Sequence, residues 1–122
     1  IEIVTPKYDE EKLKYFLAFD VFVHPSRFEG MPMALVEALA LGCPSMATPG
    51  TNMSDVVLKC GGWECDPNPE SIIDILLKIY SKKNDLKKIR NLSHNFMKTE
   101  FTWRNIAERM KSEYTKLLND SL

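Results

Sequence analysis

A short apolar run followed by two prolines, a glycine and two glutamates constrains this chain more than any other stretch. Val21, Phe22 and Val23 are typical of a buried strand, and Pro25 ends it because proline has no N–H for a ladder hydrogen bond. A helix is expected to begin at Pro32, where the fixed φ suits the first turn and the missing N–H is not needed. The pattern therefore predicts a strand, a loop and a helix in immediate succession.

The loop between this strand and this helix has the features of an anion site. Ligands of open α/β sheets bind beyond the carboxyl ends of strands, where the free N–H groups and the dipole of a helix N-terminus favour a phosphate. Gly30 lets the backbone turn there, Glu29 stands before the helix, and Glu37 lies within it. Carboxylates accept hydrogen bonds from sugar or ribose hydroxyls. We therefore expect a phosphorylated sugar as the ligand.

The same residues resemble a known family signature. Glu29 and Glu37 are separated by seven residues, Pro25 and Ser26 precede them, and residues 37–44 read EALALGCP. This arrangement resembles the E-x7-E signature of the retaining glycosyltransferases with two Rossmann domains (the GT-B fold), in particular family 4. The resemblance covers residues 1–66, and the helical remainder fits the C-terminal tail of such enzymes. It implies an α/β fold with a Rossmann-like parallel sheet and flanking helices.

Strand-like and helix-like stretches alternate along the chain. Strands are expected at residues 1–4, 21–23, 44–48 and 62–65. Helices are expected from residue 9, at 32–41, from 69 through 79, at 86–96 and at 103–118, and a short helical or turn segment is expected at 56–58. Such alternation predicts βαβ units and a parallel sheet.

The number of strands also bears on domain organisation. At 122 residues the chain is one domain or part of one, and three or four strands are too few for a complete doubly wound sheet. In the family that it resembles, a further βαβ portion precedes the strand at residue 1, and a separate N-terminal domain binds the acceptor. The resemblance thus implies an incomplete C-terminal nucleotide-sugar domain over residues 1–122, with a mostly helical tail over 69–122, that is inactive alone.

The resemblance assigns a role to each glutamate. Glu29 is expected to accept hydrogen bonds from the transferred sugar and to be the catalytic residue, whereas Glu37 is expected to hold the ribose hydroxyls of the nucleotide. An ordinary loop acid is the alternative for Glu29, and a solvent-facing helix residue is the alternative for Glu37. The apolar neighbours of Glu37 argue against simple exposure, because an unpaired carboxylate among them would be costly.

Backbone amides are the expected partners of the donor's phosphates. The amides of Met33 and Ala34 are expected to stabilise the leaving diphosphate, an electrostatic task that needs no metal. The amides of Gly30 and Met31 would then face hydroxyls of the donor sugar. Pro32 offers no N–H and stands where many members of the family have glycine.

Four further side chains are candidates for donor binding, each with an alternative. His24 is placed to reach a phosphate or the acceptor, or else is a structural histidine. Arg27 is placed to neutralise phosphate, or else is a surface arginine. Thr51 and Asn52 lie in the loop after the next strand, where they contact the donor or only shape the turn.

Charge and cysteine content exclude several classes. A net charge of −1 gives no bulk attraction to nucleic acid, and no stretch approaches the ~20 apolar residues that span a bilayer. Lysines and arginines gather over residues 78–98, where peripheral contact with an anionic membrane and a solvated helix face are the two interpretations. The three cysteines lack the spacing of a disulfide framework or a metal site and suit a reducing cytoplasm.

Together with these features, the resemblance implies that the chain is the donor-binding part of a cytoplasmic, metal-independent retaining glycosyltransferase, with the inner face of the membrane as an alternative location. A nucleoside-diphosphate sugar is the expected donor, a glycan or lipid-linked molecule is the expected acceptor, and no further cofactor is expected. Two other classes stay open: a nucleotide-sugar epimerase on the same fold, and a non-catalytic nucleotide-binding or scaffolding module.

Overall fold

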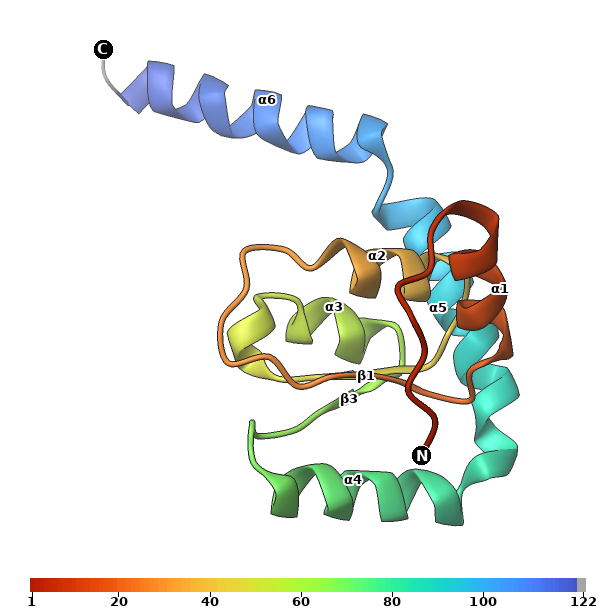
Figure 1. The fold of residues 1–122 in the computed structure, drawn as a ribbon. Helices are drawn as coiled ribbons and strands as arrows, with labels where there is room; N and C mark the ends of the chain where they lie inside the picture. Colours follow the sequence, from red (N-terminus) through yellow and green to blue (C-terminus); the bar gives the residue numbers. More distant parts are fainter. Residues whose placement is uncertain (121–122) are drawn as a thin grey trace.

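Three short parallel strands form the sheet around which the rest of the chain is arranged (Figure 1). The computed structural model describes residues 1–120 of the 122, and within them the strand order is β1-β2-β3. The strands are β1 (Phe22–His24), β2 (Ser45–Ala47) and β3 (Trp63–Glu64). The central strand β2 is buried throughout, and β3 is an edge strand, as its sequence predicts. The parallel pairing of both neighbours confirms the predicted βαβ arrangement.

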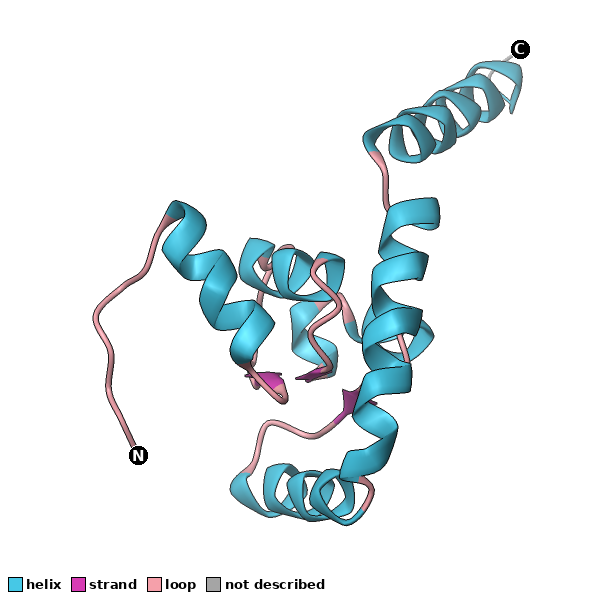
Figure 2. Cartoon of the chain, turned by 90° about the vertical axis from the view of Figure 1, so that its right-hand side faces the viewer, coloured by secondary structure: helices cyan, strands magenta, loops and turns pink. Residues whose placement is uncertain are grey.

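Helices cover both faces of this sheet. Figures 1 and 2 show α2 and α3 on one face and α4 on the other. α2 crosses from β1 to β2, and α3 crosses from β2 to β3. The helices among the described residues are α1 (Asp9–Ala18), α2 (Met33–Ala40), α3 (Ser54–Lys59), α4 (Pro69–Ser81), α5 (Leu86–Glu100) and α6 (Trp103–Asp120), with short 3-10 turns η1 (Pro49–Thr51) and η2 (Lys83–Asp85).

The start of α4 follows from its capping residues, and the start of α2 from a proline. α4 begins at Pro69, as predicted, and the side chain of Asn68 accepts a hydrogen bond of 2.8 Å from the Ser71 amide. α2 begins one residue later than predicted, at Met33. Pro32 precedes it with an extended backbone (ψ 107°) and acts as the N-cap residue.

Two buried clusters hold α2 in place. One joins α2 to the sheet, α3 and α5, and consists of Leu35, Leu39, Ala47, Met53, Val57, Cys60 and Met97. The other joins α2 to α1 and consists of Phe16, Ala38 and Cys43. Because α2 is packed from two sides, the helix that carries Glu37 has a defined position against its neighbours.

Polar side chains of α5 add a third restraint on α2. The Ser93 hydroxyl donates to the Leu39 carbonyl oxygen at 2.8 Å, and the His94 Nδ1 lies 2.9 Å from the Ala40 carbonyl oxygen. Both carbonyls belong to the last turn of α2, where the intrahelical hydrogen bonds run out. α5 therefore fixes the C-terminal end of the helix whose N-terminal end faces the candidate site.

The predicted strand at residues 1–4 is wrong. Residues 1–8 contain no strand or helix, and the side chains of Ile1 and Ile3 are exposed. A strand needs a neighbour for its backbone hydrogen bonds, and within residues 1–120 no other strand pairs with this segment. Its alternating apolar residues are consequently left without a partner.

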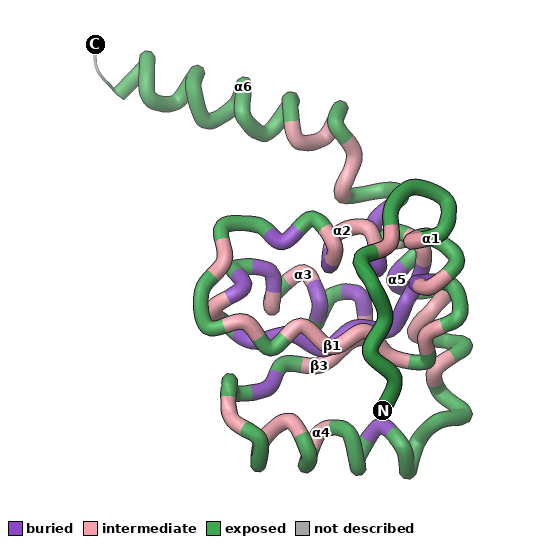
Figure 3. The backbone as a smooth tube through the Cα atoms, in the orientation of Figure 1, coloured by how far each residue is buried: buried purple, intermediate pink, exposed green. Residues whose placement is uncertain are grey.

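The C-terminal half is helical, as expected, through residue 120, and residues 121 and 122 of the predicted tail lie outside the described part of the chain. Figure 3 shows α6 exposed along almost all of its length, and no residue in it is buried. None of the helices within residues 1–120 combines the length and apolarity that crossing a bilayer requires.

Candidate functional site

The two loops that follow β1 and β2 meet at one edge of the sheet. Residues 25–32 lead from β1 into α2, and residues 48–53 lead from β2 into α3. Both loops start at carboxyl ends of neighbouring parallel strands, which is the edge where open α/β sheets bind ligands. The predicted site residues therefore lie at the edge that the topology favours.

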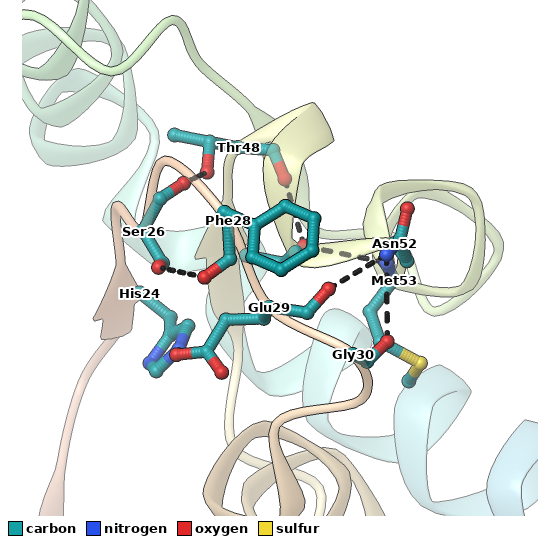
Figure 4. Close-up of polar contacts among 9 residues, drawn as sticks. His24, Ser26, Phe28, Glu29, Gly30, Thr48, Asn52 and Met53 are labelled. Atoms are coloured by element: carbon teal, nitrogen blue, oxygen red, sulfur yellow. Dashed lines mark hydrogen bonds and ion pairs between the residues drawn. The ribbon is translucent and has the colours of Figure 1, made fainter.

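Hydrogen bonds tie these loops together (Figure 4). The Glu29 amide donates to the Gly50 carbonyl oxygen at 2.8 Å, and the Asn52 side-chain amide donates to the Glu29 carbonyl oxygen at 2.7 Å. The Thr48 hydroxyl donates to the Ser26 carbonyl oxygen. The backbone at Glu29 is thus held from both sides.

Gly50 permits the close approach of the two loops. A Cβ atom at this position would lie 2.2 Å from the carbonyl oxygen of Arg27. Only glycine fits at this distance, so the identity of residue 50 sets the separation of the loops.

The first turn of α2 presents several unused N–H groups. The Leu35 and Val36 amides both donate to the Pro32 carbonyl oxygen, at 3.0 and 3.2 Å. Within residues 1–120, the four amides that were predicted to face the donor have no hydrogen-bond partner: Gly30, Met31, Met33 and Ala34. Free N–H groups at a helix start attract an anion.

Glu29 lies beside His24 across this edge. Figure 4 shows the two side chains turned toward each other, and the Glu29 Oε1 lies 3.4 Å from the His24 Nε2. The imidazole stacks on the ring of Phe22, with centroids 5.9 Å apart. The Glu29 side chain remains 38% exposed, and its carboxylate has lone pairs available for a ligand.

Glu37 has a partner that no sequence motif indicated. The Lys12 ammonium on α1 donates to the Glu37 Oε1 at 3.0 Å and lies 2.8 Å from Oε2. Oε2 has no hydrogen bond in the usual geometry, so its contact with the ammonium is an ion pair only. Lys12 stands one turn before the buried Phe16 on the same face of α1, but this spacing does not indicate that Glu37 is its partner.

The other predicted side chains take different positions. Asn52 is exposed, and its side chain is bonded to the loop backbone. Arg27 is exposed, and no ion pair involves it within the described chain. Thr51 is fully buried, and its hydroxyl donates to the Thr48 carbonyl oxygen at 2.7 Å, which matches the turn-shaping alternative.

Comparison with known proteins then identifies the family. Residues 1–96 match the family described as glycosyl transferases group 1. The chain belongs to this family. The predicted resemblance to retaining family 4 enzymes is thereby confirmed.

Relatives of this group 1 glycosyltransferase chain are several times longer than it. One component of the Homo sapiens phosphatidylinositol N-acetylglucosaminyltransferase is 31% identical over 98 residues, covering 80% of this chain and 20% of that protein. The amylovoran biosynthesis glycosyltransferase of Erwinia amylovora is 26% identical over 126 residues, covering 97% of this chain and 31% of that protein. The chain spans between a fifth and a third of the length of these relatives.

A solved structure confirms the fold class. The sucrose-phosphate synthase of Thermosynechococcus elongatus superposes with a TM-score of 0.74 at 23% identity, over 95% of this chain and 30% of the synthase. The group 1 chain is therefore a parallel α/β sheet with flanking helices that matches part of a GT-B glycosyltransferase.

Metal-ligating and nucleophilic side chains are sparse in this group 1 chain. No cluster of three or more histidines, cysteines or acids with metal-site geometry occurs in the described residues. Cys43, Cys60 and Cys65 are free and buried, and burial raises the pKa of each thiol above its ordinary value. Thiols held in the neutral form are poor nucleophiles.

Proposed function

We propose that this chain is the donor-binding part of a metal-independent retaining glycosyltransferase that uses a nucleoside-diphosphate sugar. Membership of the group 1 glycosyltransferases supports the reaction class. The observation that carries the proposal is the first turn of α2, whose free amides are flanked by two glutamates. Amides for a diphosphate and carboxylates for hydroxyls are what such a donor requires.

The amides of Met33 and Ala34 are proposed to stabilise the diphosphate as it leaves. In this step the acceptor hydroxyl bonds to the sugar's anomeric carbon from the face that the diphosphate leaves, and its proton passes to the departing phosphate. The bond between the anomeric carbon and the phosphate oxygen breaks, and negative charge grows on that oxygen. Preorganised N–H groups at a positive helix end stabilise such a charge without reorganising during the reaction. Gly30 and Met31 are proposed to direct their amides to the sugar.

Glu29 and Glu37 are proposed to read the two hydroxyl-bearing parts of the donor. Glu29, held in a loop that is bonded on both sides, orients the transferred sugar. Glu37, one turn into α2, holds the ribose. His24 is proposed to contact a phosphate or the acceptor, and Arg27 to neutralise phosphate charge. Asn52 is proposed to hold the Glu29 backbone in place through its hydrogen bond to the Glu29 carbonyl oxygen.

The acceptor is proposed to be a glycan or a lipid-linked molecule, as in polysaccharide or glycolipid biosynthesis. The names of the relatives support this class, since they include enzymes of amylovoran and O-antigen biosynthesis and a phosphatidylinositol N-acetylglucosaminyltransferase. A cytoplasmic location is part of the proposal, with peripheral membrane contact through the basic residues of α4 and α5. No nucleic-acid partner is included, because the net charge is −1.

Binding of nucleoside diphosphates tests the proposal. Titration calorimetry with UDP, GDP and ADP should detect at least one ligand for the unmodified chain. Glu37→Gln should weaken its binding roughly tenfold, because a charged acceptor of the ribose hydroxyls is lost. Glu10→Gln is the matched control, since Glu10 is an exposed glutamate on α1 that no hydrogen bond or ion pair involves within residues 1–120.

Three results would contradict the proposal in different ways. Absence of binding by all three diphosphates would refute donor binding. If Glu37→Gln binds the diphosphate with the same affinity as the unmodified chain, a nucleotide-binding or scaffolding module with another ligand pose is favoured. Conversion of a nucleotide sugar without any acceptor, seen by mass spectrometry, would favour an epimerase.

A further inference from the structure

We propose that Lys12 is a positioning residue of the donor site, which orients the Glu37 carboxylate and cancels its charge beside the donor's diphosphate. The proposal rests on the proposed function, in which Glu37 holds the ribose of the nucleotide. Lys12 itself lies on α1, outside the two loops and the helix that carry the predicted site.

The contact between the two side chains is close and double. The Lys12 Nζ lies 3.0 Å from Oε1 and 2.8 Å from Oε2 of Glu37, so the ammonium sits across the carboxylate rather than at one end. Each side chain is 33% exposed. Partial burial strengthens the ion pair relative to a fully solvated one, because solvent screens it less.

Packing of α1 on α2 brings the pair together. Phe16 on α1 is 4% exposed and packs with Ala38 and Cys43. Lys12 stands one turn before Phe16, and Glu37 is the residue before Ala38, so both charged groups lie at the margin of this contact. The packing of the two helices therefore brings the two charged side chains within reach of each other.

The carboxylate keeps capacity for a ligand while it is held. An ionised carboxylate has about four lone-pair sites on its two oxygens, and the lysine uses one hydrogen bond on Oε1. Oε2 is buried beside the ammonium, so a ribose hydroxyl would reach the carboxylate from the exposed third of the side chain, through the lone pair of Oε1 that the lysine does not use. Lys12 thus fixes the direction of the carboxylate and leaves acceptor capacity on Oε1.

Charge cancellation matters because of where Glu37 lies on α2. Side chains of a helix lean toward its N-terminus, so the Glu37 carboxylate extends over the turn that contains Met33 and Ala34. The proposed diphosphate binds at the amides of that turn. An unpaired carboxylate there would repel the phosphates, and the lysine ammonium removes that repulsion.

The test compares Lys12→Met, Lys12→Arg and Lys14→Met by calorimetry, using the best-binding nucleoside diphosphate and the corresponding nucleoside. Lys14 is the matched control, because it is an exposed lysine on the same helix that no hydrogen bond or ion pair involves in the described part of the chain. Lys12→Met should weaken diphosphate binding roughly fivefold and nucleoside binding less. Lys12→Arg should keep most of the affinity of the unmodified chain for the diphosphate. The difference in diphosphate affinity between Lys12→Met and the unmodified chain should shrink at high ionic strength.

A double-mutant cycle separates positioning from a structural contact. In a Glu37→Gln background, Lys12→Met should have little further effect on diphosphate affinity, since the charge that it cancels is gone. Thermal unfolding of each variant shows whether it is folded. If Lys12→Met does not fold, Lys12→Gln takes its place in the cycle.

Two outcomes overturn the inference, and they differ from failure of the proposed function. Folded Lys12→Met or Lys12→Gln protein that binds diphosphate like the unmodified chain would refute the positioning role and leave donor binding intact. If Lys12→Met weakens nucleoside and diphosphate binding equally, and does so to the same extent in the Glu37→Gln background, the ion pair serves only as a structural contact between α1 and α2. Failure of the unmodified chain to bind any diphosphate refutes the proposed function first, and this inference with it.

Discussion

At the scale of single residues, the candidate site depends on the close packing of the loop that carries Glu29 against the loop that carries Gly50. Glu29 is held by its own amide on the Gly50 carbonyl and by Asn52 on its carbonyl, so the backbone is fixed while the carboxylate stays accessible. This division suits a residue that must present acceptor atoms in one direction. Its rigidity comes from the fit of the two loops, which Gly50 allows.

Gly50→Ala tests this fit. The added Cβ would lie 2.2 Å from the Arg27 carbonyl oxygen and 2.6 Å from its carbon, so the backbone must shift and the Glu29 hydrogen bond to Gly50 must weaken. We expect a loss of about 1–3 kcal/mol in the free energy of unfolding, measured by urea titration. Gly30→Ala in the same site is the control, because a Cβ there meets nothing within 4 Å, and its stability should change by less than about 0.5 kcal/mol. Equal stabilities of the two variants would mean that the loops are not locked together.

At the scale of elements, the sequence predicts best those helices and strands whose formation depends on residues within the element itself. Pro69, the Asn68 cap and the apolar period that follows predict α4, and α4 forms where expected because these signals act within one helix. Residues 1–4 alternate like a strand and form none, because a strand depends on a neighbour that the segment itself does not specify. The contact of Lys12 with Glu37 depends on how α1 packs on α2, which spacing along the chain does not encode.

The link between α5 and α2 is an element-scale contact that can be measured. Ser93 is fully buried and donates to the Leu39 carbonyl oxygen, and that oxygen also accepts from the Gly42 amide. Ser93→Ala should therefore remove one hydrogen bond without orphaning the carbonyl, lowering the free energy of unfolding by about 1 kcal/mol in urea titrations. Ser112→Ala on the exposed α6 is the control and should stay within about 0.5 kcal/mol of the unmodified chain. A Ser93 variant as stable as this control would show that α5 holds α2 by apolar contacts alone.

At the scale of the whole molecule, the sheet has a free edge at β1, where no further strand pairs within residues 1–120. A groove of about 660 Å³ lies between α4 and the residues that lead into β1, Asp20 and Val21, and apolar side chains dominate its lining. Ile73, Leu77 and Tyr80 of α4 are exposed there, and β1 pairs on one side only, with β2. Together with relatives three to four times as long, this supports the proposal that further polypeptide, including another βαβ portion, completes the sheet in the active protein.

The last prediction follows from that proposal: the 122-residue chain alone should transfer no sugar. In the proposed binding mode, the free amides of α2 and the two glutamates would contact only part of a nucleoside-diphosphate sugar, and no acceptor-binding domain is proposed within these residues. Catalysis requires that donor and acceptor be held together, so a chain that binds only the donor is expected to bind without transferring sugar. Incubation with labelled UDP-, GDP- and ADP-sugars and a mixture of glycan and lipid acceptors should yield no labelled product, although calorimetry detects diphosphate binding. A longer protein containing this chain is the positive control and should give product. Transfer by the chain alone at a comparable rate would show that the donor site is complete within it and that the free edge of the sheet at β1 needs another explanation.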